Sequence, residues 1–185
     1  GQVKTNATVD TTLVQGGINI DMQKTERRYT IEDLVDNYDK LLANSHDSLV
    51  ILPEGALPTY LREQPGVISW LKSKAAEKHL DIVVGSMDRS EANRPYNAAY
   101  GIASSGIALP EVYHKRFLVP IGEYTPLLVN YLPEWVKRWT NTPAGGGFAA
   151  GKEPVLLDLS RGKIAPLICF ESILPEVTAA SCRAG

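Results

Sequence analysis

The fold class of this chain is indicated most clearly by residues 48–55, SLVILPEG. The apolar run Ser48–Leu52 is too short for a stable helix and predicts a buried strand. Pro53 has no backbone N–H for a sheet ladder, so it should end that strand. Glu54 then follows directly, a carboxylate where a buried strand meets a loop.

The segments around this strand alternate between helix and strand patterns. A helix is expected from about residue 25 to 43, because its apolar residues recur at helical spacing. A second helix should begin after Pro65-Gly66. Short β-rich runs at 11–15 and 81–85 predict two more strands. Strands that alternate with helices indicate an α/β protein.

The second half of the chain predicts two hairpins and a last helix. Residues 97–103 and 111–115 flank a turn at 104–106, and residues 155–159 and 163–169 flank a turn at 160–162. A final helix should start near Leu174. Residues 120–151 are rich in Pro, Gly and Trp and predict a long, lid-like excursion.

Composition limits the kinds of partner and cofactor. The 185 residues are 44% hydrophobic and 22% charged, as in one folded domain. The net charge of −2 and the scattered basic residues predict no nucleic-acid partner. The three histidines are dispersed and should be surface or packing residues, so we expect no metal and no cofactor. The only cysteines, Cys169 and Cys182, are too few for a disulfide framework, and the sequence leaves open whether they pair.

No apolar run approaches the roughly 18 residues needed to span a bilayer, and no signal peptide is visible. The chain begins with Gly1 rather than Met. We therefore expect a soluble piece of a longer protein whose other segments the sequence does not show.

Three groups that can do chemistry are expected at strand ends, where α/β folds open a crevice. They are Glu54, Lys115 and Cys169. A cysteine after an apolar strand is often an inert core residue, but beside a cation and a base it becomes a nucleophile. Glu54 is either that base or a loop carboxylate, and Lys115 is either an oxyanion stabiliser or a surface lysine.

Other chemistries fit the sequence less well. Residues 146–152 imitate the spacing of a phosphate-binding loop. However, Glu153 stands where Ser or Thr should hold magnesium, and Pro154 blocks the required helix. The chain also lacks a Gly-x-Ser-x-Gly elbow, so a serine hydrolase of that type is not expected.

Taken together, these stretches resemble the nitrilase, or carbon–nitrogen hydrolase, superfamily, most closely its apolipoprotein N-acyltransferase branch. Nearly the whole chain takes part. The most specific stretch is residues 113–126, YHKRFLVPIGEYTP, and the others are LVQG at 13–16, LPE at 52–54, YN at 96–97, GKEP at 151–154 and APLICFE at 165–171. The resemblance implies an α-β-β-α sandwich in which residues 1–185 form one catalytic domain, incomplete at its C-terminus.

The resemblance also implies residue roles within a Glu-Lys-Cys triad. Cys169 would be the acylated nucleophile, Glu54 the general base and Lys115 the oxyanion stabiliser. Four further residues would support the triad. Glu123 would assist the lysine or the base, and Glu171 would order the site. The backbone N–H of Phe170 would be a second oxyanion donor, and Asn97 belongs to the Tyr-Asn pair.

The implied function is that of an enzyme, an acyltransferase. It would move an acyl chain from a phospholipid, through a cysteine thioester, to the amine of a diacylglyceryl-cysteine at an apolipoprotein's N-terminus. The parent protein would lie in a bacterial inner membrane with this domain on the periplasmic side. The apolar residues of the excursion would then serve as a lid or membrane anchor, or else cover the site or core. The alternative is a soluble amidohydrolase that acts on a small amide.

Overall fold

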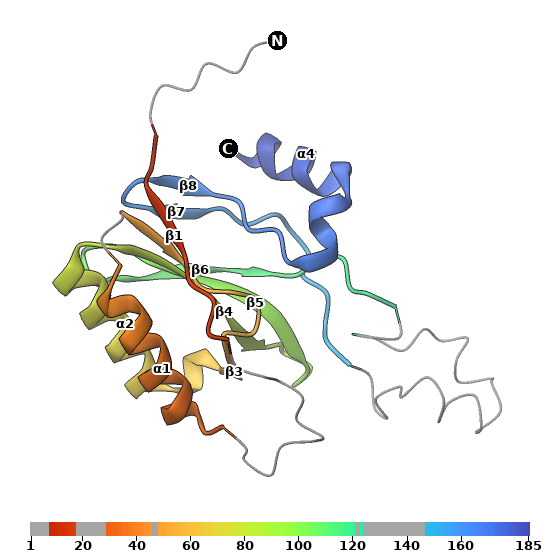
Figure 1. Cartoon of the computed structure of the whole chain (residues 1–185). Helices are drawn as coiled ribbons and strands as arrows, with labels where there is room; N and C mark the ends of the chain where they lie inside the picture. Colours follow the sequence, from red (N-terminus) through yellow and green to blue (C-terminus); the bar gives the residue numbers. More distant parts are fainter. Residues whose placement is uncertain (1–7, 18–28, 46–47, 121–122, 124–146) are drawn as a thin grey trace.

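The computed structural model describes residues 8–17, 29–45, 48–120, 123 and 147–185. Its centre is a six-stranded mixed sheet in the order β1-β2-β4-β5-β6, with β3 also paired to β4 (Figure 1). The strands β1, β2, β3 and β4 run parallel, whereas β5 and β6 are antiparallel additions. Their bounds are β1 Thr11–Leu13, β2 Leu49–Ile51, β3 Leu57–Tyr60, β4 Asp81–Arg89, β5 Pro95–Ile102 and β6 Ala108–His114.

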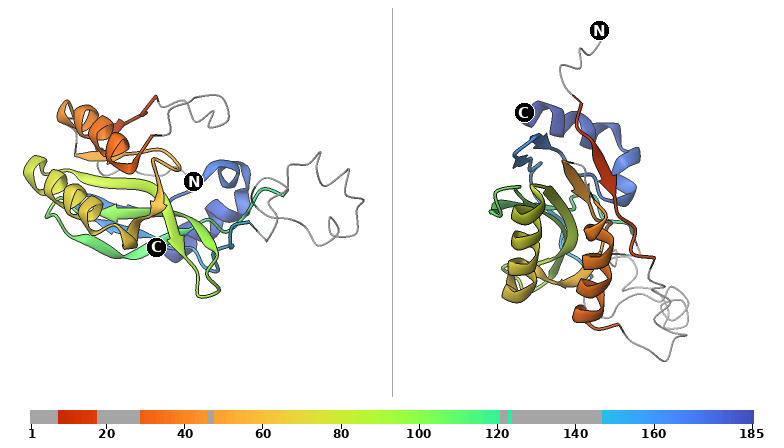
Figure 2. Two further views of the ribbon diagram at one scale, coloured as in Figure 1. Left: turned by 90° about the horizontal axis from the view of Figure 1, so that it is seen from below. Right: turned by 60° about the vertical axis from the view of Figure 1, so that its left-hand side comes forward.

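Two helices, α1 (Ile31–Ala43) and α2 (Pro65–Lys78), cover one face of this sheet (Figure 2). The short 3-10 helix η1 (Leu61–Glu63) precedes α2. Helix α1 begins where it does because Thr30 caps it: the Thr30 hydroxyl accepts a hydrogen bond from the backbone N–H of Asp33, and the Asp33 carboxylate accepts one from the N–H of Thr30.

The opposite face of the sheet carries a hairpin of β7 (Leu157–Leu159) and β8 (Gly162–Ile164). The 3-10 helix η3 (Cys169–Ile173) and helix α4 (Pro175–Ala184) follow on the same side (Figures 1 and 2). The predicted α/β class and the layering of helices, sheet, sheet and helix are therefore confirmed. In the described residues the second sheet consists of β7 and β8.

Two apolar clusters hold these layers together, and β4 contributes to both because alternate side chains of a strand point to opposite faces. Ile82 and Val84 pack with α1 and α2, while Val83 packs with Leu157 and Leu159 of the hairpin. All five side chains are buried. The sheet is thus covered on both faces, as a largely parallel sheet requires.

The strand predicted for residues 163–169 is wrong in its second half. β8 ends at Ile164, and Cys169 opens η3 instead of ending a strand. The physical reason is Pro166, which lacks the N–H needed to extend a ladder. The expected strand end at Cys169 is therefore corrected to a strand-to-helix junction.

Other boundaries differ by a few residues. The strand expected at 11–15 ends at Leu13, and the second helix begins at Pro65 instead of after Gly66. β4 extends to Arg89, well past the expected end at 85, because β5 pairs along its whole length. Strand β3 was not predicted. Most of the excursion at 120–151, and the start of the first predicted helix, lie outside the described residues.

Candidate active site

Glu54 lies in the turn that follows the parallel strand β2, which ends at Ile51. This turn presses against β4 at Gly85. A Cβ atom on Gly85 would lie 2.3 Å from the carbonyl oxygen of Pro53 and 2.8 Å from the Cα of Glu54. Only glycine allows so close an approach, so β4 fixes where the Glu54 carboxylate is presented.

Lys115 is buried directly after β6, with 1% of its surface exposed. Its backbone is held on two sides: its N–H donates to the carbonyl of Asn97 on β5, and its carbonyl accepts from the N–H of Gly151, both at 2.8 Å. Its ammonium lies 2.7 Å from the Glu123 carboxylate and 3.7 Å from that of Glu54. Of the two alternatives for Lys115, the surface lysine is therefore excluded.

The ammonium of Lys115 stays charged despite its burial. Desolvation alone would lower its pKa. The hydrogen bond to Glu123 and the electrostatic influence of Glu123, Glu54 and Cys169 outweigh that effect, so the pKa of Lys115 lies above its ordinary value. A fixed positive charge thus sits among two carboxylates and a cysteine.

Asn97 keeps the two carboxylates in place. Its side-chain amide donates to Glu54 Oε1 at 2.5 Å and more weakly to Glu123 Oε1 at 3.4 Å. The other oxygen of Glu123 accepts from the backbone N–H of Val119 at 2.8 Å. Donors therefore surround Glu123, which suits an ionised carboxylate that supports the lysine.

Cys169 begins η3 with a φ of 55°, in the left-handed region that side chains other than glycine rarely adopt. It is exposed and forms no disulfide, and Cys182 is also free. Together with Glu54 it lines a cavity of about 350 Å³ walled by the end of β2, β4, β5 and the segment 164–168. Residues held in such strained backbone conformations cluster at functional sites, so Cys169 remains a candidate.

Glu171 anchors the loop that carries Cys169. It is completely buried, and its carboxylate accepts four hydrogen bonds of 2.8–3.1 Å. The donors are the Tyr113 hydroxyl and the backbone N–H groups of Arg116, Phe117 and Ile168. These bonds tie η3 to β6 and to the segment that follows Lys115. Phe170 lies between Cys169 and Glu171 in η3, with 42% of its surface exposed.

The structure thus groups the predicted site residues, although their catalytic roles remain predictions. Glu54, Lys115, Asn97 and Glu123 form one hydrogen-bonded cluster, and Cys169 shares a cavity with Glu54. Sequence reasoning missed Gly85 and Tyr113. Tyr113 lies two residues before Lys115, on the same face of β6, so the period of a strand could have pointed to it.

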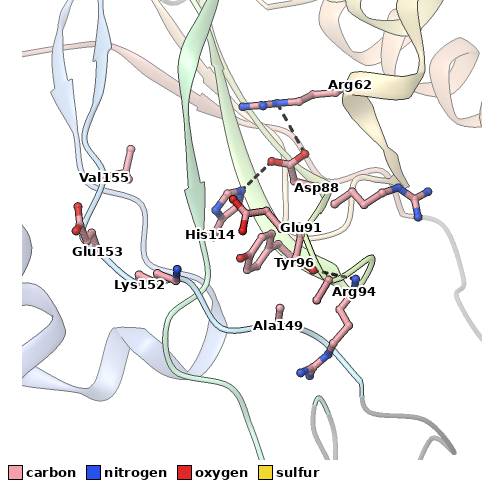
Figure 3. Close-up of a pocket in the computed structure, with 13 residues that line it drawn as sticks. Arg62, Asp88, Glu91, Arg94, Tyr96, His114, Ala149, Lys152, Glu153 and Val155 are labelled. Carbon is pink, nitrogen blue, oxygen red and sulfur yellow. Dashed lines mark hydrogen bonds and ion pairs between the residues drawn. The ribbon is translucent and has the colours of Figure 1, made fainter.

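A second, larger pocket of about 600 Å³ opens near the far end of β4 and β5 (Figure 3). In it His114 stacks on Tyr96, with ring centroids 4.1 Å apart, and its Nε2 lies 2.8 Å from the Asp88 carboxylate. Arg62 pairs with the same carboxylate at 3.7 Å. Tyr96 and His114 are chain neighbours of Asn97 and Lys115, so this pocket lies next to the cluster that those two residues form with Glu54 and Glu123.

Among residues 8–17, 29–45, 48–120, 123 and 147–185, no group of acidic, histidine or cysteine side chains is arranged to hold a metal ion. In the same described part of the chain, no helix has the length and apolarity required to cross a membrane.

Solved structures of other proteins share this fold. A carbon–nitrogen hydrolase from Helicobacter pylori matches with a TM-score of 0.59 at 16% identity, over 95% of this chain and 56% of that one. A CN-hydrolase superfamily protein from Xanthomonas campestris, with an arsenic adduct in its active site, matches with a TM-score of 0.53 at 21% identity, over 78% of this chain and 50% of that one. At these identities the likeness shows the fold alone.

Residues 11–185 match the family model of carbon–nitrogen hydrolases, and the chain belongs to that family. Among curated relatives, the apolipoprotein N-acyltransferase of Geobacter metallireducens is 33% identical over 179 residues, and that of Chromobacterium violaceum is 30% identical over 175. Each match covers 94% of this chain but only 33% of the relative. The chain therefore spans about a third of the length of these relatives.

Proposed function

We propose that the full-length gene product containing this chain transfers an acyl chain from a phospholipid to the N-terminal amine of a diacylglyceryl-cysteine apolipoprotein. The names of the curated relatives support this reaction. The observation that carries it is the charged Lys115 between two carboxylates, with Cys169 on the adjoining cavity. That arrangement provides a nucleophile, a base and a fixed cation in one place.

In the first half-reaction, the Cys169 sulfur attacks an ester carbonyl of the phospholipid. The S–C bond forms, and the oxyanion is stabilised by the Lys115 ammonium and by the backbone N–H of Phe170. Glu54 takes the thiol proton and returns it to the departing glycerol oxygen as the C–O bond breaks. The products are a thioester on Cys169 and a lysophospholipid.

In the second half-reaction, the acceptor's amine attacks the thioester. Glu54 removes a proton from the amine nitrogen as the N–C bond forms, the C–S bond breaks, and Glu54 returns that proton to the departing Cys169 sulfur. The free enzyme is restored, and the product is an amide. Because a thioester is far more reactive toward an amine than the starting oxygen ester, two steps replace one difficult step.

The supporting residues keep this geometry. Glu123 holds the Lys115 ammonium, Asn97 orients the Glu54 carboxylate, and Glu171 fixes the loop that carries the nucleophile. We further propose that the parent protein lies in a bacterial inner membrane with this domain on the periplasmic side, since both substrates are lipids. The excursion at 120–151 would then contact lipid.

A second candidate is an amidohydrolase in which water accepts the acyl group. It would use the same three residues, and similar folds occur in proteins described as carbon–nitrogen hydrolases. The two candidates differ in the acyl donor, a phospholipid or a small amide, and in what discharges the acylated Cys169. Water would do so rapidly in the hydrolase, whereas an amine is needed in the transferase.

The test is acylation of the full-length gene product in detergent micelles, followed by intact mass and peptide mapping. We expect phospholipid to give an adduct on Cys169 that persists in buffer. A diacylglyceryl-cysteine peptide with a free amine should discharge it, whereas the N-acetylated peptide should not. Rapid loss of the adduct in water would favour the hydrolase. The Cys182→Ser variant removes the second exposed cysteine, so any adduct that it forms lies on Cys169. If neither wild-type protein nor this variant is acylated at Cys169, both candidates fail.

A further inference from the structure

A groove of about 420 Å³ lies beside the candidate active site, between the segment after Lys115 and the segment that returns from the excursion. It is distinct from the cavity that Cys169 lines and from the pocket in Figure 3. Its described lining consists of two arginines and four apolar residues, namely Arg94, Arg116, Phe117, Leu118, Phe148 and Ala150.

Arg116 carries an unmet hydrogen-bond donor. Within the described residues, Nη1 of its guanidinium is buried and has no acceptor. A buried donor without a partner costs free energy, and native structures rarely keep one without a reason. A guanidinium donates in a planar fork that matches the oxygens of a phosphate or carboxylate. The missing partner is therefore best supplied by an anion.

The charge around the groove supports an anionic ligand. No acidic residue is among the lining residues. The carboxylate of Glu171, which accepts from the backbone N–H of Arg116, already accepts four hydrogen bonds from neighbouring donors. Arg94 donates to the carbonyls of Gly147 and Phe148, so it holds one wall of the groove and adds a second positive charge.

The rest of the groove is apolar. Phe117 is 38% exposed, and the Arg116 guanidinium lies 5.7 Å from the centre of its ring. Leu118 and Phe148 are half-buried beside it. The Arg116 guanidinium beside this apolar surface suits a ligand that has both an anionic group and a hydrocarbon chain.

The groove is connected to the loop of Cys169 through the backbone of two of its lining residues. Arg116 follows Lys115 directly, and the backbone N–H groups of Arg116 and Phe117 bind the carboxylate of Glu171. Glu171 stands two residues after Cys169 on the same short helix. Glu171 therefore connects the backbone of Arg116, which lines the groove, to the short helix that begins at Cys169.

We propose that this groove binds the phosphate of the phospholipid acyl donor, with the Arg116 guanidinium as its ligand and Phe117, Leu118 and Phe148 against its hydrocarbon. The proposal rests on the proposed function and extends it, because it makes Arg116 a residue that selects phosphate-bearing donors. A fatty carboxylate shares this chemistry, and the experiment separates the two.

The test compares two donors with the same acyl chain on the full-length gene product in micelles: phosphatidylglycerol and a p-nitrophenyl ester, which has no phosphate. Arg116→Gln should raise the phosphatidylglycerol concentration for half-maximal Cys169 acylation by about tenfold or more, as expected for loss of a charge-assisted hydrogen bond. Arg116→Lys, which keeps the charge without the fork, should lose less. Acylation by the p-nitrophenyl ester should change by no more than about twofold.

Arg161→Gln is the matched control, because Arg161 is exposed on the turn between β7 and β8. Equal losses with both donors, or none with either, would overturn the proposal. Direct titration with dihexanoyl phosphatidylglycerol and with hexanoate tests the groove without any reaction. Arg116→Gln should bind the phosphatidylglycerol about tenfold or more weakly than wild-type protein does. Tighter binding of hexanoate than of phosphatidylglycerol by wild-type protein would also overturn the proposal. If phosphatidylglycerol binds but never acylates Cys169, the proposed function fails and the groove stands.

Discussion

Replacing Glu171 with glutamine tests how the loop of Cys169 is held. Each oxygen of the buried carboxylate accepts two hydrogen bonds: Oε1 from the N–H groups of Arg116 and Phe117, and Oε2 from the Tyr113 hydroxyl and the N–H of Ile168. An amide has one accepting oxygen and one donating nitrogen. Two of the four donors must therefore lose their acceptor.

The cheaper orientation of the amide leaves its oxygen at the Oε1 position. The Tyr113 hydroxyl can then rotate and accept from the new NH₂ group, but the N–H of Ile168 is left without an acceptor. An orphaned buried donor costs roughly 1–3 kcal/mol, and the remaining bonds weaken because their acceptor is no longer charged. We expect Glu171→Gln to lower the free energy of unfolding by about 2–4 kcal/mol in total.

The assay is urea and thermal unfolding of the purified protein. A loss of this size should lower Tm by about 5–15 °C in a domain of this length. Glu111→Gln, on an exposed position of β6, is the matched control and should change little. A double-mutant cycle with Tyr113→Phe should show coupling, since burial and the Glu171 carboxylate raise the pKa of Tyr113 and keep it a donor. A Glu171→Gln protein within about 0.5 kcal/mol of wild type, with additive effects in the cycle, would refute the reasoning.

Three further changes test other parts of the site. Gly85→Ala places a methyl group 2.3 Å from the carbonyl oxygen of Pro53. We expect it to lower the free energy of unfolding by about 1–3 kcal/mol and to slow acylation of Cys169. The control Gly66→Ala has open space around the new methyl group and should be neutral or stabilising. Burial would raise the pKa of Asp88, but its hydrogen bonds and neighbouring cations outweigh this and hold that pKa below 3.8. Its contribution to stability is therefore present above about pH 4 and lost as pH falls through the lower folded pKa, so urea melts from pH 5 to 2 should show a shallower acid loss in Asp88→Asn. Lys115→Met should slow acylation of the cysteine about 10²–10³-fold in single-turnover mass measurements; a smaller change than about fivefold would argue against its role as oxyanion stabiliser.

Local sequence patterns predicted most of the elements because their causes are local. The helix ending at Ala43 and the strand ending at Ile51 follow from the spacing of apolar residues and from Pro53. The same reasoning failed for residues 165–169, where apolar composition suggested a strand. A strand needs a partner and a donor at each paired position, and Pro166 has no N–H to offer.

The identity and chain order of the candidate base, oxyanion stabiliser and nucleophile could be predicted from the sequence, since motif residues need no fold to be recognised. Tertiary structure alone decided their electrostatics. Burial of Lys115 between Glu54 and Glu123, the positive φ of Cys169 and the four donors around Glu171 arise from segments that meet only when the sheet and its loops pack. The energies of charge pairs and hydrogen bonds depend on the distance between the groups and on the exclusion of water. Only folding brings these groups to short distances and removes water from around them.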